Sequence, residues 1–518
     1  MRLWDRCLIV NAKKVGQAIS SVVIFTLIAK LLGFFRELLL SYYFGATGIS
    51  DAYLISQSIP GTIFQFVGTG LTTCFIPVFF QVLNKEGKRK ADYFTNTLIA
   101  MVLFFSTAVI FLIWIFTSQV VKVFASGFTG DTLSYAVWFT RIGVLSLYFS
   151  TIIYIYNSYF QANKVYGPTA FAAIPNSLCI MASIALGAKL NLWLLPIGSC
   201  LAVGVQMMFL VVPVHRTGFR LHLNLNWKDL HVKKFFGLIG PVILGVSVNQ
   251  VNTLVDRTVA SQVAVGGISA LTYANSLIMF VQGGLVDPIN TVFYPQITEA
   301  VSLNDGEGAR KAIEKVLNYV LTLLVPITGG FIVFRRLITD ALFGRGAFDA
   351  TASEMSSIAL CFYAAGLCFI GIREMLSRFY YAHSNTKIPM RNSAIGVAIN
   401  IVMNLVLSRF LGIAGLAIAT SLSAMVTALM LWAECDIHLK CGMISISLKD
   451  LLKTAIAAIV SILFSYFLSQ RIAAGNLIKL IIVVCISVLV YCIIGVMLRI
   501  ELFDAVKKLI QDRVKKGN

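Results

Sequence analysis

The sequence predicts an all-α membrane protein that crosses the bilayer many times, and three observations lead to that class: composition, recurring apolar segments and the sorting of charges. The chain has 518 residues, 58% of them hydrophobic and 13% charged, and its mean hydropathy is +0.84. A soluble domain is about 25% charged, so a large water-facing surface is excluded. The first apolar segment carries charges and leads directly into a second one, which is not the pattern of a cleaved signal peptide.

Apolar segments close to the roughly 20 residues that cross a bilayer recur along the whole chain. Each is expected to form one transmembrane helix. We count fourteen of them, at 17–44, 49–83, 94–124, 131–161, 167–188, 191–215, 235–263, 267–298, 312–340, 352–382, 388–409, 413–437, 449–470 and 475–498.

Basic residues gather in alternate loops. Clusters such as 85–90, 216–234 and 310–315 lie on one side, whereas the opposite loops hold few lysines and arginines. The positive-inside rule therefore places both termini in the cytoplasm, which requires an even number of spans. The net charge of +19 is read as this topology signal, so nucleic acid is not predicted as a partner.

No pattern of catalytic or cofactor-binding residues competes with a membrane role. The sequence has no GxSxG, Walker or HExxH motif, and its five histidines lie at span ends or in loops. The ten cysteines form no CxxC pair, and most lie inside apolar segments as small core residues. We therefore expect neither an enzyme nor a cofactor.

Three short motifs occur twice, in the same order. Gly48-Ile49-Ser50 returns as Gly267-Ile268-Ser269, Phe75-Ile76-Pro77 as Phe293-Tyr294-Pro295, and Tyr159-Phe160-Gln161-Ala162 as Phe379-Tyr380-Tyr381-Ala382. Six spans separate the copies, so both enter the membrane in the same direction. This is a parallel repeat, as in transporters that work by alternating access.

The repeat divides the chain into two six-helix lobes followed by two further helices. The parts are an N-lobe at 1–216, a cytoplasmic linker at 217–231, a C-lobe at 232–441, spans 13 and 14 at 442–498, and a tail at 499–518. The tail has apolar residues at helical spacing opposite charged ones. We expect it to lie on the inner leaflet, the alternative being a helix that binds a partner.

Ionisable side chains inside membrane spans are costly and usually mark a cavity or a partner. An adjacent acid–base pair occurs in the first helix of each lobe: Arg36 with Glu37, and Asp256 with Arg257. Adjacent residues project about 100° apart on a helix, so neither pair is expected to close as a self-contained salt bridge. Lys30 adds a third cation to span 1.

Other polar residues in the spans allow two interpretations each. Asn249, Asn252 and Asp256 form a stripe along span 7 that serves either interhelical hydrogen bonding or the functional site. Asp51, at the start of span 2, is either a helix cap or a gate residue. Asp287 in span 8 is expected to be buried and is a candidate for binding a cation or a proton, so the sequence leaves a metal site unknown.

Several motifs resemble those of one transporter family. They are, in order, Lys30-Leu31-Leu32-Gly33-Phe34-Phe35-Arg36-Glu37, Phe44-Gly45-Ala46, Asp51-Ala52-Tyr53, Ile59-Pro60, Leu342-Phe343-Gly344-Arg345-Gly346-Ala347-Phe348, Arg378-Phe379-Tyr380-Tyr381-Ala382, Asn385-Thr386-Lys387 and Pro389. In order and spacing they resemble the MurJ (MviN) family, the lipid II flippases of the multidrug/oligosaccharidyl-lipid/polysaccharide (MOP) exporter superfamily. The resemblance covers nearly the whole chain.

The resemblance implies two lobes in a V and a cationic central cavity that binds the pyrophosphate of an undecaprenyl-linked sugar. It also implies that spans 13 and 14 form a groove for the lipid tail. By position, Lys30 stands where the family commonly has arginine, Arg36 matches an arginine, Glu37 replaces a common aspartate, and Asp51 matches directly.

Two positions depart from the family pattern. Gln65 stands near a span 2 position where the family often has arginine, and Ser276, after Asn275, stands at a second one. Arg257 is expected to compensate in part. The departures leave the exact substrate open between lipid II and another lipid-linked glycan.

The resemblance thus implies a flippase that carries lipid II from the inner to the outer leaflet of the bacterial cytoplasmic (inner) membrane, for cell wall biogenesis and cell shape. The alternatives are a flippase for a related polyprenyl-pyrophosphate glycan (an exopolysaccharide or teichoic unit), a membrane glycosyltransferase or polymerase, and a drug or cation exporter. The expected partners are the lipid-linked glycan, membrane lipids and a coupling ion, Na⁺ or H⁺. We expect a monomer.

Overall fold

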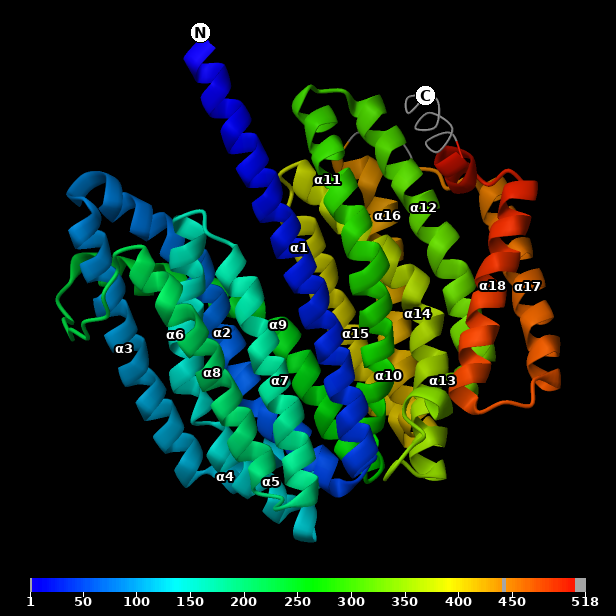
Figure 1. Cartoon of the computed structure of the whole chain (residues 1–518), viewed down its shortest axis with the longest axis horizontal. Helices are drawn as coiled ribbons and strands as arrows, with labels where there is room; N and C mark the ends of the chain where they lie inside the picture. The colour runs from blue at the N-terminus through cyan, green and yellow to red at the C-terminus, as the bar shows by residue number, and fades with distance from the viewer. Residues whose placement is uncertain (1, 440–443, 508–518) are drawn as a thin grey trace. The chain divides into compact units, whose positions relative to one another are not determined.

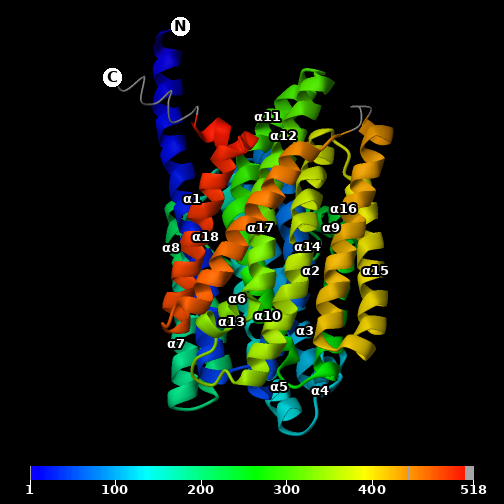
Figure 2. The same ribbon diagram turned by 90° about the vertical axis from the view of Figure 1, so that its right-hand side faces the viewer.

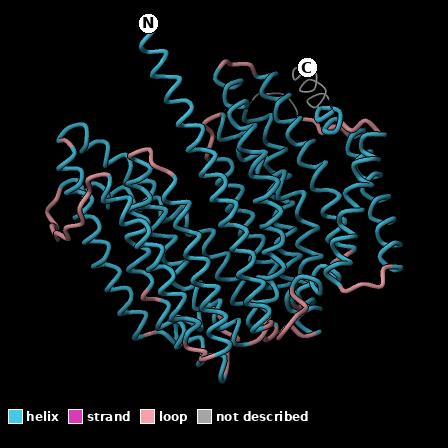
Figure 3. Tube along the Cα trace, in the orientation of Figure 1, coloured by secondary structure: helices cyan, strands magenta, loops and turns pink. Residues whose placement is uncertain are grey.

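The computed structural model describes the backbone of residues 2–439 and 444–507, and the side chains in these ranges apart from those of 2–21, 67, 241–249, 436 and 438. This part of the chain consists of helices and their connections and contains no strand (Figure 1, Figure 3). The all-α class predicted from composition is therefore confirmed.

The chain forms two compact units, Met1–Gly266 and Gly267–Asn518. The helices of the first unit are α1 (Arg2–Phe44), α2 (Gly48–Glu86), α3 (Lys88–Ile115), α4 (Thr117–Phe124), α5 (Gly130–Gly143), α6 (Ser146–Ala162), α7 (Gly167–Lys189), α8 (Leu194–Arg216) and α9 (Leu230–Val263). Those of the second unit are α10 (Gly267–Val281), the π-helix η1 (Gln282–Val286), α11 (Asp287–Ser302), α12 (Gly306–Val333), α13 (Arg335–Leu342), α14 (Ala350–Ala382), α15 (Lys387–Leu411), α16 (Ile413–Leu439), α17 (Leu448–Arg471) and α18 (Asn476–Met497).

Every predicted span falls on one helix or on consecutive helices. Within the described residues, 11 helical segments are long and apolar enough to cross a membrane, and α5 with α6, which meet at 46°, make a twelfth. The protein is therefore a multi-span membrane protein. The predicted spans 17–44 and 235–263 lie on α1 and α9, which include side chains outside the described set, so the total of fourteen stays a prediction.

Helix boundaries repeat along the chain as the sequence motifs do. α3 and α4 have 28 and 8 residues, and α12 and α13 have the same two lengths. The break between the members of each pair falls at Phe116 and at Phe334, which are 218 positions apart. The internal repeat therefore extends from short motifs to the placement of helix ends.

The core of the first unit is aromatic and lies around α2. Phe75 stacks on Phe79 and on Phe94, with ring centroids 5.3 and 5.8 Å apart. Tyr159 of α6 meets Phe79 edge-on at 5.4 Å. All four rings are buried, and aromatic pairs of this kind add to the free energy gained by burial. This packing fixes α2 and the polar residues at its start.

α9 packs within the first unit, against α2, α3 and α4. Thr258 Oγ1 donates to the Val123 carbonyl at 2.8 Å, and Gly127 N donates to Ser261 Oγ at 3.0 Å. A Cβ on Gly127 would lie 2.1 Å from the Ser261 carbonyl oxygen, so this approach requires glycine. The first compact unit thus includes α9. The division of the chain into lobes and a linker at 217–231 stays a prediction.

α17 and α18 lie side by side at one edge of the second unit (Figure 2). α17 packs on α12, and Tyr491 of α18 donates its hydroxyl to the Thr322 carbonyl at 2.6 Å. The ring of Phe503 meets that of Tyr491 at 5.7 Å. The described part of the predicted tail, 499–507, therefore packs against α18 through Phe503, and 508–518 lie outside the described residues.

Candidate functional site

The site begins with the Arg36–Glu37 pair on α1. Arg36 Nη2 lies 2.9 Å from Glu37 Oε1, and the two side chains are 38% and 10% exposed. The expectation that this pair would not close on itself is wrong, because both side chains are long enough to bend toward each other across the ~100° between them. Lys30, on the same helix, is exposed.

α2 brings a buried hydroxyl next to this pair. Tyr53 is 3% exposed, and its hydroxyl lies 2.7 Å from Ser199 Oγ of α8. Arg36 and Glu37 are both close enough to Tyr53 to interact with it electrostatically. Tyr53 carries no charge, so the charged residues of the spans do not point to it, although it belongs to the motif Asp51-Ala52-Tyr53.

Arg257 approaches the same region from α9. Its Nη1 donates to the backbone carbonyl of Leu54 on α2 at 3.3 Å. The acids close enough to act on its charge are Glu37, Asp256 and Asp51. Glu37 therefore interacts with both arginines that the sequence singled out, and it does so within one compact unit.

Asp51 is buried, with 1% of its surface exposed, and it does not cap α2, because Thr47 holds the N-cap position. Asp51 Oδ2 instead accepts a hydrogen bond from the Gly266 amide, 215 positions away, at 2.8 Å. Gly266 has a φ of +79°, and a Cβ there would lie 2.0 Å from the Ala46 carbonyl oxygen. Asp51 thus fastens the turn after α9 to the start of α2. The interpretation of Asp51 as a helix cap is therefore wrong, and its role as a gate residue stays a prediction.

α9 makes one hydrogen bond within its polar stripe and another, from Gln250, to α2. Asn252 Nδ2 donates to Asp256 Oδ2 at 3.4 Å. Gln250 Nε2 donates to Gln65 Oε1. Gln65, one of the two departures from the family pattern, is therefore in contact with α9. The side chain of Asn249 lies outside the described residues.

Three further candidates lie in the second unit. On α10, Asn275 is exposed, and Ser276 is half-buried and donates to the Tyr273 carbonyl at 2.7 Å. Asp287 begins α11 and is exposed, so the expectation of burial is wrong; the π-helical turn before it changes the helical register. In the described part of the chain, no group of three His, Cys, Asp or Glu side chains could hold a metal ion.

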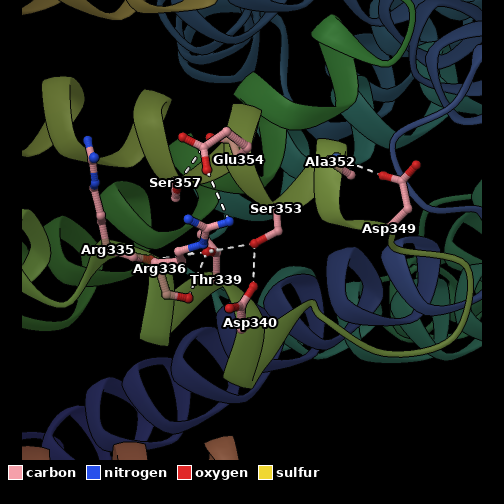
Figure 4. A network of polar contacts seen from close by, with 9 residues as sticks. All are labelled: Arg335, Arg336, Thr339, Asp340, Asp349, Ala352, Ser353, Glu354 and Ser357. Atoms are coloured by element: carbon pink, nitrogen blue, oxygen red, sulfur yellow. Dashed lines mark hydrogen bonds and ion pairs between the residues drawn. The ribbon is translucent and has the colours of Figure 1, made fainter. Parts of the chain in front are cut away.

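A polar network that the sequence did not reveal fastens α13 to α14 (Figure 4). Ser353 Oγ donates to Asp340 Oδ1, and Arg336 Nη2 lies 3.4 Å from Glu354 Oε2. Asp349 caps α14 by accepting a backbone amide at 2.7 Å. Each of the three carboxylates thus has a partner within the network. We assign it a structural role.

Many membrane-spanning helices with arginines and acids set among them define a polytopic membrane transporter. The family described as "Lipid II flippase MurJ" matches residues 40–492. The chain belongs to this family, whose members are transporters and not enzymes. The family predicted from the motifs is therefore confirmed.

Relatives and solved structures agree with this assignment. A "Probable lipid II flippase MurJ" from Rickettsia prowazekii is 25% identical over 464 residues, which cover 88% of this chain and 91% of that protein. One from Vibrio cholerae is 28% identical over 424 residues, covering 79% and 80%. A structure titled "Lipid II flippase MurJ, inward closed conformation" has a TM-score of 0.81 at 23% identity and covers 92% of this chain and 98% of its own. An inward-facing MATE transporter of the MOP superfamily has a TM-score of 0.66 at 12% identity, covering 80% and 94%.

Proposed function

We propose that this protein moves lipid II, an undecaprenyl-pyrophosphate-linked peptidoglycan precursor, from the inner to the outer leaflet of the bacterial cytoplasmic membrane by alternating access. One observation carries the proposal: Arg36 and Arg257, from helices far apart in the sequence, both interact with the carboxylate of Glu37. Two guanidinium groups in one region suit a pyrophosphate, which arginine can bind in a bidentate manner. Membership of the family supports lipid II as the cargo.

The physical need for such a site follows from the bilayer. A sugar–pyrophosphate headgroup cannot cross ~30 Å of hydrocarbon unaided, because its polar groups would lose their hydration. Within the protein the head travels past cations while the tail stays in lipid. Lys30 is exposed and Arg36 is 38% exposed, so a ligand can reach both. When the pyrophosphate binds, it replaces the Glu37 carboxylate as the anion beside the arginines. Because the arginines lose one anionic partner as they gain another, their affinity for the pyrophosphate stays low enough for its release.

The proposal includes fourteen spans with both termini in the cytoplasm; α1 and α9 are the two spans added to the twelve. An inside-negative membrane potential favours outward movement of an anion by ~2.3 kcal/mol per charge per 100 mV, and it favours inward return of the empty cationic site. A coupling ion, Na⁺ or H⁺, is a second source of energy in this scheme. The working unit is a monomer.

We assign the parts of the chain by the repeat. Residues 1–216 and 232–441 are the two lobes, joined by the linker 217–231. Residues 442–498 form the groove for the lipid tail, and 499–518 lie on the inner leaflet. The matching lengths of α3 with α12 and of α4 with α13 support this division, because they follow the same offset as the sequence motifs.

Native mass spectrometry of the protein, gently extracted from its own membrane, tests the substrate. We expect one retained lipid II molecule, which Arg36→Ala loses. If a different polyprenyl-pyrophosphate glycan is retained, that glycan is the substrate in place of lipid II. This outcome is included because Gln65 and Ser276 stand at two positions where the family often has arginine. If neither lipid is retained, the proposed cargo is wrong. If the sample forms new glycosidic bonds, the transporter role is wrong.

Two neighbouring charges should have separable effects. Arg257→Gln is expected to weaken lipid II binding by about tenfold, since a hydrogen bond to a charged group contributes about 1.5–3 kcal/mol. Glu37→Gln should slow turnover more than it weakens binding, because the arginines lose the carboxylate that positions them. Lipid II titration and transport in proteoliposomes measure the two quantities. Equal losses of binding in both variants would contradict these separate roles.

A further inference from the structure

A basic pocket lies at the start of α3, apart from the site described above. Its volume is about 760 Å³, and it is formed by the first turns of α3 and the segment that joins α8 to α9, the green loop beside α3 in Figure 1. Four basic side chains and an imidazole line it: Lys88, Arg89, Lys90, Arg220 and His222.

The joining segment is held firmly in this position. Phe219 is 1% exposed, and its ring centroid lies 5.0 Å from that of Tyr159 in the core of the first unit. Asn96 Nδ2 donates to the Arg220 carbonyl at 3.0 Å, and Asn96 Oδ1 accepts from the His222 amide at 3.0 Å. A segment expected to be a simple linker is thus packed against α3, and its basic residues are brought to those of the helix.

The charges of the pocket are not balanced by its own residues. Of the described residues that line it, Asp92 supplies the one carboxylate, and it already accepts from the Tyr159 hydroxyl at 3.0 Å. Lys88 Nζ donates to a backbone carbonyl at 2.6 Å. Neither Arg89 nor Arg220 has a carboxylate partner within the described part of the chain. Cations held close together repel one another, so an anion in the pocket would stabilise it.

We propose that this pocket binds a phosphate-bearing anion, supplied either by the headgroup of an anionic phospholipid or by a soluble phosphate. Arg89 and Arg220 offer bidentate donors, and Lys88 and Lys90 offer point charges, which together suit a phosphate. Basic clusters next to membrane spans bind anionic headgroups through the same chemistry. The inference does not depend on lipid II transport, because none of these residues belongs to the Arg36 site.

The test uses the full-length protein and two variants of equal charge. The pocket variant removes three exposed cations that make no hydrogen bond needed to hold the segment: Arg89→Gln, Lys90→Gln and Arg220→Gln. The control variant removes three exposed lysines elsewhere: Lys164→Gln, Lys233→Gln and Lys387→Gln. Equal thermal stability of the variants without ligand shows that both fold.

Two probes distinguish the sources of phosphate. In one arm, phosphatidylglycerol is titrated into delipidated protein and followed by native mass spectrometry, with phosphatidylcholine as the neutral comparison. In the other arm, inorganic phosphate and pyrophosphate are added at constant ionic strength, and the shift of the unfolding temperature is measured. Wild type and the control variant should bind alike, and the pocket variant, which lacks three cations, about 100-fold more weakly.

A difference in the phosphatidylglycerol arm alone assigns the pocket to a lipid headgroup, and a difference in the second arm assigns it to a soluble phosphate. If the pocket and control variants lose affinity equally, or neither loses any, the proposal is overturned. Arg36→Ala serves as a further control, because it should leave binding at this pocket unchanged. A variant that loses lipid II transport but keeps phosphate binding at this pocket affects only the proposed function. A variant that loses phosphate binding but keeps transport affects only the proposal for this pocket.

Discussion

A strain depleted of its own lipid II flippase is expected not to grow when Arg36→Ala is the sole copy of this protein. Arg36 is 38% exposed and pairs with Glu37 at 2.9 Å, so its guanidinium is held in place and is still reachable by a ligand. Alanine removes a charge-assisted donor worth about 1.5–3 kcal/mol per hydrogen bond, which is about 10- to 100-fold in affinity for the pyrophosphate.

The defect should lie in transport and not in folding. The membrane-fraction yield and the unfolding temperature of Arg36→Ala should match wild type, because the lost side chain is not part of the buried core. Arg36→Lys should keep partial function if charge alone matters and little if bidentate geometry matters. Lys122→Ala, which removes an exposed cation from α4, should grow normally. Normal growth with Arg36→Ala would remove Arg36 from the site.

The helical fold was predictable because its signal is local. Each span is a run of apolar residues that a bilayer requires to be helical, since every backbone amide must be satisfied within the segment. The break at Phe116 and its counterpart at Phe334 lie inside predicted spans, 94–124 and 312–340, and hydropathy alone does not reveal them. The two breaks lie 218 positions apart, which is the offset of the repeated motifs.

The contacts of the site were less predictable, because they depend on side chains that meet across the fold. Charge inside a span selected Arg36, Glu37 and Arg257, and the structure brings all three to one region. Ideal helical geometry, however, gave the wrong answer for the Arg36–Glu37 pair, because it places Cβ atoms and ignores the reach of long side chains. Tyr53 carries no charge, and although it belongs to the motif Asp51-Ala52-Tyr53, its place beside Arg36 and Glu37 follows only from the fold.

The joining segment between α8 and α9 shows a second limit. Its polar composition predicts a solvent-exposed linker, and most of it is exposed. One aromatic residue, Phe219, carries no periodic signal, and yet its burial against Tyr159 decides where the segment lies. A single anchor of this kind has no local signature, so the basic pocket could not be derived from the sequence.

Gly266→Ala is expected to destabilise the protein by about 2 kcal/mol or more and to impair transport. The residue has a φ of +79°, and a Cβ would lie 2.0 Å from the Ala46 carbonyl oxygen. The left-handed conformation alone costs a non-glycine residue about 1–2 kcal/mol, and the backbone clash adds to it. The turn must therefore move, which breaks the hydrogen bond from the Gly266 amide to Asp51 at 2.8 Å.

A double-mutant cycle shows whether Gly266→Ala and Asp51→Ala destabilise the protein through the same hydrogen bond. Asp51→Ala alone should also lower the unfolding temperature, because it leaves the Gly266 amide without its acceptor. If Gly266→Ala has already broken this hydrogen bond, adding Asp51→Ala should cost much less than it does in wild type. Gly61→Ala is the matched control: a Cβ there meets nothing within 4 Å, so stability should be unchanged or slightly raised. Additive effects of the two substitutions would mean that Asp51 does not fasten the turn after α9.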